Sequence, residues 1–173
     1  LKSKNLLINV GDEGGFAPSI NSNKEALNLI VDAIESAKLK PGKDLAICLD
    51  VAANELIDKN GNYSIQTGSY ENVDNVINYY KNIVSKYPIK SIEDPFGEED
   101  WSAWTKLTSE IGKNVQIVGD DLFVTNEKRL KKGTDKKSAN SILIKLNQIG
   151  TFTETINVID LAQKNNFSTI ISH

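Results

Sequence analysis

Short apolar runs of strand length recur along the chain, and each run closes on polar or charged residues. Runs that are continuous in apolar character, rather than alternating, are typical of parallel strands that are buried on both faces. The predicted strands are LLINVGDEGG (6–15), DLAICLD (44–50), IKSIED (89–94), VQIVGDD (115–121), SILIKLN (141–147) and STIISH (168–173).

Apolar residues at helical spacing occupy the intervals between these runs. Ser22 and Glu25 form a capping-box pattern, which predicts a helix that ends before the Pro41-Gly42 pair. The turn-rich NGNYSIQTGS predicts a small hairpin or loop before the next helix. The remaining helices are predicted from Val73 up to Pro88, from Trp101 to Ile111, from a Thr125 cap, and from a Thr151 cap with Glu154.

The alternation of strand and helix predicts an α/β fold in which helices cover a parallel sheet. No linker, repeat or low-complexity tract divides the chain, so we predict a single domain over residues 1–173. In a (β/α)8 barrel the functional residues come from the carboxyl ends of several strands, whereas a doubly wound sheet gathers its ligands around one crevice. Five successive strand ends carry functional-looking groups, which favours the barrel over the doubly wound alternative: Asp50, Glu93, Asp120, Lys145 and His173.

Composition excludes some classes of function. The net charge of −3 and pI near 5.3 give no support to nucleic acid as a partner, and a local cluster of lysines (131, 132, 136 and 137) is interpreted as a solvated face. The only cysteine, Cys48, is predicted to be buried, permits no intrachain disulfide and indicates a reducing compartment. No apolar stretch reaches the length of a membrane span. Since the sequence contains no methionine, we expect it to be a segment of a longer protein.

Three of the strand-end residues are carboxylates that would suit a magnesium ion. Asp50, Glu93 and Asp120 form a hard-oxygen set, which Mg²⁺ prefers. Each acid alone has a structural explanation as a cap or turn residue, and for Asp121 we keep that explanation. Acids that converge in one register repel each other and need a cation, so the set as a whole predicts a metal site.

Two further stretches contain candidate functional residues. Lys145 is the odd residue in SILIKLN; burial would lower its pKa and acidic neighbours would raise it, so the direction stays open, as does a solvated edge-strand role. The glycine-rich GDEGGFAPS (11–19) gives backbone freedom around Asp12 and Glu13, but it is compatible with an ordinary turn and matches no phosphate-loop or dinucleotide pattern.

Taken in order, six stretches make the sequence resemble enolase, the phosphopyruvate hydratase of glycolysis, across most of its C-terminal barrel domain. These stretches are NVGDEGGFAP (9–18), LDVAANE (49–55), SIEDPF (91–96), QIVGDDLFVTN (116–126), LIKLNQIGT (143–151) and ISH (171–173). The resemblance implies a partial (β/α)8 barrel of the enolase type, without the N-terminal domain and the last barrel units. The 173-residue chain is therefore expected to be an incomplete and inactive segment of the full enzyme.

The resemblance also implies the chemistry: reversible, Mg²⁺-dependent dehydration of 2-phosphoglycerate to phosphoenolpyruvate. Asp50, Glu93 and Asp120 would hold the metal, Lys145 would accept the C2 proton and Glu13 would donate a proton. The substrate would contact Glu93, Asp120, Lys145, Ser172 and His173. The implied protein is a cytoplasmic homodimer or larger homo-oligomer, with a surface or secreted location as a secondary possibility for the family and no nucleic-acid or membrane partner.

Two alternative functions remain open from the sequence. An acid-sugar dehydratase or racemase of the same superfamily would share the metal acids and a lysine base, although GDEGGFAP argues against it. A non-catalytic enolase segment acting as a binding or surface protein is the second alternative. Turnover assays with 2-phosphoglycerate and with sugar acids distinguish these functions.

Overall fold

Five parallel strands form the centre of the computed structural model, which describes residues 1–12, 14–66 and 69–173. The strands are hydrogen-bonded in the order β1-β4-β5-β6-β7, and every neighbouring pair is parallel. Their bounds are β1 Ile47–Asp50, β4 Ile89–Glu93, β5 Gln116–Gly119, β6 Ser141–Ile144 and β7 Ser168–Ile171. The predicted α/β class is confirmed. In the described part of the chain β1 and β7 each have one neighbour, so this sheet is open.

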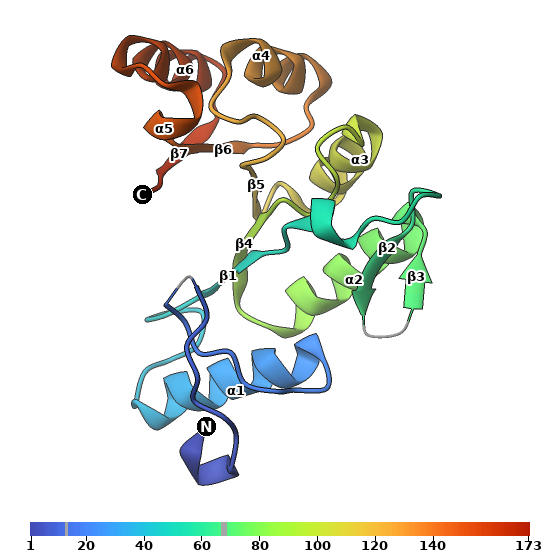
Figure 1. Ribbon diagram of the computed structural model, residues 1–173, viewed down its shortest axis with the longest axis vertical. Coiled ribbons are helices and arrows are strands. Elements are labelled where there is room, and N and C mark those ends of the chain that lie inside the picture. Colours follow the sequence, from blue (N-terminus) through green and yellow to red (C-terminus); the bar gives the residue numbers. More distant parts are fainter. Residues whose placement is uncertain (13, 67–68) are drawn as a thin grey trace.

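Helices connect the successive strands, and the strand–helix units follow one another along the long axis of the molecule, from the blue N-terminal end to the red C-terminal end (Figure 1). The five longer helices all begin with a side-chain cap, from Ser22, Asn72, Asp100, Asn126 and Thr151 in turn. The helices are α1 Asn23–Ser36, α2 Val73–Lys86, α3 Trp101–Ile111, α4 Glu127–Lys136, α5 Leu146–Ile149 and α6 Phe152–Lys164, with short 3-10 helices η1 Lys2–Lys4 and η2 Ala53–Leu56. No helix in the described ranges has the length and apolar character to cross a membrane.

The excursion between η2 and α2 is a hairpin, as predicted. Strands β2 Tyr63–Gln66 and β3 Ser69–Glu71 pair antiparallel. Tyr63 is fully buried, and its ring meets that of Phe96 edge to face at 5.3 Å between centroids. The hairpin is therefore packed against the segment that follows β4.

The core lies between the sheet and its covering helices. Ile92, Ile117 and Ile142, on three adjacent strands, are each fully buried, and Trp104 of α3 is buried with them. The fully buried Phe123 follows β5 and closes the core toward α4. Its ring lies so close to two glycines that an added Cβ would come within 2.5 Å of the ring at Gly119 and 2.4 Å at Gly133.

We expect Gly133→Ala to destabilise the protein, although alanine normally gains about 1 kcal/mol over glycine in a helix. The new methyl group would overlap the Phe123 ring, which cannot retreat because Gly119 lies against its other atoms. Overpacking of this kind costs about 1–3 kcal/mol. Urea unfolding should show a lower midpoint for Gly133→Ala, whereas Lys128→Ala, at an exposed position of α4, should behave like the parent. An unchanged midpoint for Gly133→Ala would show that the contact is loose.

The predicted strand over 6–15 is wrong. The described residues of this stretch contain one isolated antiparallel bridge, between Val10 and Phe16. The chain turns back on itself there, since Gly11 N–H donates to Gly15 O and Ala17 N–H donates to Asn9 O. Among the described residues no strand pairs with this apolar run, and most of its apolar side chains remain exposed, Val10 by 59%.

Three further expectations need correction. The strand predicted over 141–147 ends at Ile144, because the chain turns at Lys145 into the short α5. Helix α4 begins at Glu127 and is capped by Asn126, whose Oδ1 accepts the N–H groups of Lys128 and Arg129, so Thr125 is not its cap. Cys48 is exposed rather than buried. Alternation explains this last difference: Ile47 packs into the core, and the next residue of β1 faces the opposite side.

Candidate functional site

The carboxyl ends of β1, β4 and β5 bring acidic residues to one edge of the sheet. Asp50 and Glu93 are register partners across β1 and β4, and Glu93 pairs with Val118 on β5, two residues before Asp120. Asp120 is 9% exposed, whereas Glu93 is half-buried and Asp50 is exposed. Parallel pairing therefore explains why acids that are far apart in sequence end at the same edge.

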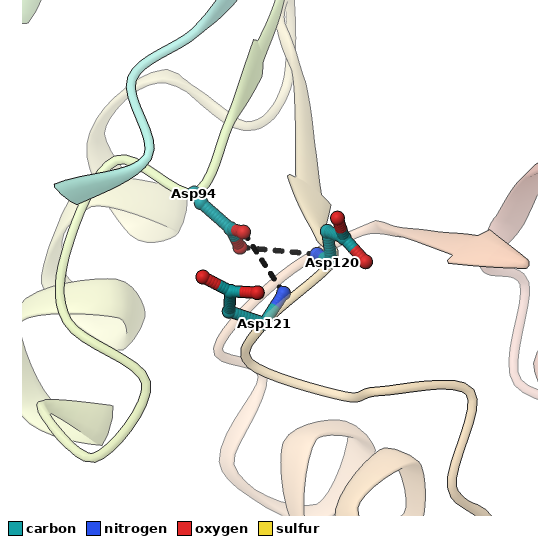
Figure 2. A group of neighbouring side chains, drawn as sticks. All are labelled: Asp94, Asp120 and Asp121. Carbon is teal, nitrogen blue, oxygen red and sulfur yellow. Dashed lines mark hydrogen bonds between the residues drawn. The ribbon is translucent and has the colours of Figure 1, made fainter. Parts of the chain in front are cut away.

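Among the described residues, however, the tightest acidic group is Asp94, Asp120 and Asp121, whose nearest carboxylate oxygens all lie within 4.8 Å of one another. Figure 2 shows the Asp94 carboxylate directed at the backbone nitrogens of the other two residues. Asp94 Oδ1 accepts the N–H of Asp120 at 3.0 Å, and Oδ2 accepts the N–H of Asp121 at 2.8 Å. Asp94 thus fixes the backbone turn that carries Asp120.

From the sequence alone, Asp94 was placed at the end of the predicted strand 89–94 and given no role of its own. Its positive φ of 40° is consistent with a turn residue, but its side chain is buried and its carboxylate binds two backbone amides. A second acid directly after Glu93, matching the Asp120-Asp121 pair one strand further on, was the available signal.

Lys145 lies directly over Asp120. Its Nζ donates to Asp120 Oδ2 at 2.5 Å, and the two side chains are only 18% and 12% exposed. Gln148 Nε2 donates to the other carboxylate oxygen of Asp120 at 2.9 Å. Burial lowers the pKa of Lys145, but the hydrogen bond to Asp120 and the charges of Asp120 and Glu93 outweigh burial and raise it. The ammonium form is therefore favoured in this arrangement.

The surroundings favour the charged form of Lys145 but disfavour the charged form of three nearby carboxylates. Burial, together with the charges of Asp50 and Asp120, raises the pKa of Glu93 to about 7. Burial also raises the pKa of Asp94 to about 7, against the lowering effect of the two amides that it accepts. Partial desolvation of the otherwise exposed Asp50 carboxylate, with the charges of Asp120 and Asp121, raises its pKa against the lowering effect of the Ala52 N–H. The raised pKa values mean that burial, and to a smaller extent neighbouring negative charge, disfavours the ionised carboxylates, which a positive charge among them would stabilise.

Asn54 and Arg129 join the loops that carry these acids. Asn54, in η2 after β1, donates from Nδ2 to Asp121 Oδ2 at 2.9 Å, and its Oδ1 accepts the N–H of Glu98 at 2.9 Å. Arg129 Nε donates to Leu122 O, and its terminal nitrogens reach the loop after β4. These bonds span the segments after β1, β4 and β5, and Asp121 is engaged in one of them. This accords with a supporting role for Asp121.

Comparison with known proteins places the arrangement in a family. A family model described as "Enolase, C-terminal TIM barrel domain" matches residues 1–173. The chain belongs to the enolase family. The curated enolase of Pelagibacter ubique (strain HTCC1062) is 60% identical over 170 residues, which cover 98% of this chain. The chain spans 40% of the length of that relative. The expected enolase-type barrel is confirmed, and the five-stranded parallel sheet is one part of such a barrel.

Three further residues are implied by the enolase resemblance: Glu13, Ser172 and His173. Glu13 lies outside the described residues. Ser172 and His173 follow β7 at the same end of the sheet as the acids, where the Ser172 N–H donates to Ile144 O and Ser172 Oγ lies 2.8 Å from His173 Nδ1. The assignments of Asp50, Glu93 and Asp120 to a metal, and of Lys145 to proton transfer, stay predictions.

The carboxylates of the candidate site fit a hard dication. Among the described residues, the Glu93 carboxylate accepts no hydrogen bond, and the Asp50 carboxylate accepts only the N–H of Ala52. Asp120 has lone pairs to spare on both oxygens, since each accepts one donor and a carboxylate oxygen offers about two sites. Three carboxylates with unused acceptor capacity are suited to Mg²⁺ rather than to a soft metal.

Proposed function

We propose that the full-length protein containing this chain catalyses the reversible dehydration of 2-phosphoglycerate to phosphoenolpyruvate. The observation that carries the proposal is the close contact of Lys145 with Asp120 at an edge where the acids of three consecutive units end, in a chain of the enolase family. A lysine among carboxylates, at the carboxyl ends of barrel strands, is an arrangement that can remove a proton next to a bound carboxylate.

Asp50, Glu93 and Asp120 would hold Mg²⁺, and Glu93 and Asp120 would lie next to the substrate. When bound, Mg²⁺ supplies positive charge that stabilises the extra negative charge on the substrate carboxylate after C2 loses its proton. Asp94 would keep Asp120 in place through the two backbone amides of the turn.

Lys145, in its neutral form, would accept the C2 proton, and the electron pair of the C–H bond would pass toward the substrate carboxylate. That electron pair would then form the C2–C3 double bond as the C3 hydroxyl leaves, with a proton from Glu13, as water. Asp120 and its neighbours favour the ammonium form of Lys145. Their negative charge would therefore be neutralised before Lys145 accepts the C2 proton. Ser172 and His173 would contact the substrate at the end of β7.

The resemblance further implies a homodimer or larger homo-oligomer and a cytoplasmic location, and both stay predictions. We also propose that residues 1–173 are one segment of the catalytic barrel and do not turn over substrate alone. The open edges at β1 and β7 leave unpaired backbone groups, and a complete barrel of this type takes about 250 residues.

We expect the full-length protein to convert 2-phosphoglycerate in a Mg²⁺-dependent manner, with turnover lost after chelation and restored by added Mg²⁺. Absorbance of phosphoenolpyruvate measures the reaction, with sugar acids as competing substrates. The 173-residue chain, assayed alongside, should show no turnover. Conversion of sugar acids without conversion of 2-phosphoglycerate would contradict the proposal, and parent-like turnover by the isolated chain would contradict its status as an incomplete segment.

A further inference from the structure

Four residues at the site form a closed ring of hydrogen bonds, and two of them have no role in the assignments above. Asp120 Oδ2 accepts from Lys145 Nζ at 2.5 Å, and Asp120 Oδ1 accepts from Gln148 Nε2 at 2.9 Å. Gln148 Oε1 accepts from Thr125 Oγ1 at 3.1 Å, and Thr125 Oγ1 accepts the backbone N–H of Lys145 at 2.8 Å. We call these residues, Asp120, Thr125, Lys145 and Gln148, the carboxylate ring.

The carboxylate ring holds Lys145 at two points. Its ammonium group is bound directly to Asp120, and its backbone N–H is bound to the same carboxylate through Thr125 and Gln148. Strand β6 ends at Ile144, so the backbone N–H of Lys145 lies beyond the hydrogen-bonded part of the sheet. The hydroxyl of Thr125 accepts this N–H instead and passes the constraint on to Gln148.

The backbone of Thr125 has an unfavourable conformation that is held by the hydrogen bonds of its side chain. Thr125 is fully buried with a φ of 52°, and the preceding Val124 has a φ of 43°. Two successive β-branched residues in the left-handed region are unusual, because their branched Cβ crowds the backbone there. The conformation aims Thr125 Oγ1 at Gln148, with the Leu143 carbonyl as a second, longer acceptor at 3.4 Å.

We propose that Thr125 and Gln148 are positioning residues of the enolase reaction, which keep the Asp120 carboxylate and Lys145 in one fixed geometry. The inference rests on the proposed function. Gln148 holds one oxygen of Asp120 and so restricts rotation of the carboxylate, in the way that outer residues orient the ligands of a metal. Thr125 transmits the same orientation to the backbone of Lys145. The pair thereby couples the metal-holding group to the proton-accepting group.

Three variants of the full-length protein test the pair. Thr125→Val removes the hydroxyl but keeps the branched shape, Thr125→Ser keeps the hydroxyl, and Gln148→Leu removes both amide contacts at an exposed residue whose replacement leaves the core intact. Matched controls are Thr134→Val, which removes a hydroxyl bonded to Lys131 O within α4, and Gln163→Leu at an exposed position of α6.

We expect Thr125→Val and Gln148→Leu each to weaken Mg²⁺ binding by about 10- to 100-fold, the usual effect of removing an outer residue of a metal site. Calorimetric Mg²⁺ titration without substrate measures this effect, and deuterium exchange at C2 of 2-phosphoglycerate should fall in parallel. Because the two residues act through one chain of bonds, the double variant should lose little more than either single variant. Thr125→Ser and both controls should resemble the parent.

Folded Gln148→Leu with parent-like Mg²⁺ affinity would overturn the inference, whatever the fate of Thr125→Val. Fully additive losses in the double variant would overturn it as well, since they would show two independent effects. A parent protein that binds Mg²⁺ but leaves 2-phosphoglycerate unchanged would contradict the proposed function instead, and the Mg²⁺ titrations would still decide the case of the carboxylate ring.

Discussion

Lys145→Ala in the full-length protein should lose dehydration of 2-phosphoglycerate and exchange of its C2 hydrogen with solvent together. The proposed mechanism gives Lys145 the C2 proton, and loss of a general acid or base typically costs about 10²- to 10⁴-fold in rate. Deuterium incorporation at C2 in heavy water, with saturating Mg²⁺, measures the exchange apart from the overall reaction. Lys136→Ala, at an exposed position of α4, is the matched control and should be unaffected.

Glu13→Gln separates the second proton transfer from the first. If Glu13 assists departure of the C3 hydroxyl, this variant should lose dehydration while it retains C2 exchange, because Lys145 is still present. Parent-like exchange by Lys145→Ala would show that another group removes the proton and that the central assignment is wrong. If Glu13→Gln lost C2 exchange while its Mg²⁺ affinity stayed intact, Lys145 and Glu13 could not be assigned to two separate proton transfers.

Asp120→Asn should weaken Mg²⁺ binding and activity together, whereas Asp121→Asn should leave Mg²⁺ affinity close to that of the parent. The first change subtracts an anionic ligand from the proposed site and also weakens the contact with Lys145. We expect its loss of affinity to reach at least the roughly 10- to 100-fold that removal of an outer residue produces. The second change keeps an oxygen that can accept the Asn54 amide.

Calorimetric Mg²⁺ titration of the two variants decides this comparison because they differ by one position in one turn. Equal affinity in Asp120→Asn and the parent would exclude Asp120 from the ligand set. If Asp121→Asn lost as much Mg²⁺ affinity as Asp120→Asn, the metal ligands would instead be the close group of Asp94, Asp120 and Asp121.

The strands were predictable wherever an apolar run pairs with another strand in the sheet. The five runs that became strands alternate with amphipathic helices, and two of the five helix caps, Ser22 and Thr151, were predicted from the sequence. The run 6–15 shows the limit of this reasoning. Apolar character makes a strand only when another strand offers hydrogen bonds, and the glycines of this stretch fold it back on itself instead.

The acids of the candidate site were predictable from position, but their supports were not. Asp50, Glu93 and Asp120 stand out because they close apolar runs, which are visible in one dimension. Asp94, Thr125 and Gln148 act through bonds to residues 20 or more positions away, and no local pattern encodes such pairs. Thr125 was even assigned as a helix cap, because a threonine before a helix most often has that role.

The order of the sheet has a kinetic consequence. Since β1, β4, β5, β6 and β7 are neighbours in the same sequence in which they occur in the chain, each new strand pairs with the one completed just before it. Loop closure then spans α3 or α4 alone, the short α5 together with α6, or η2, the β2–β3 hairpin and α2. Emerging from a ribosome, the chain can add each of these five strands to the edge formed just before it.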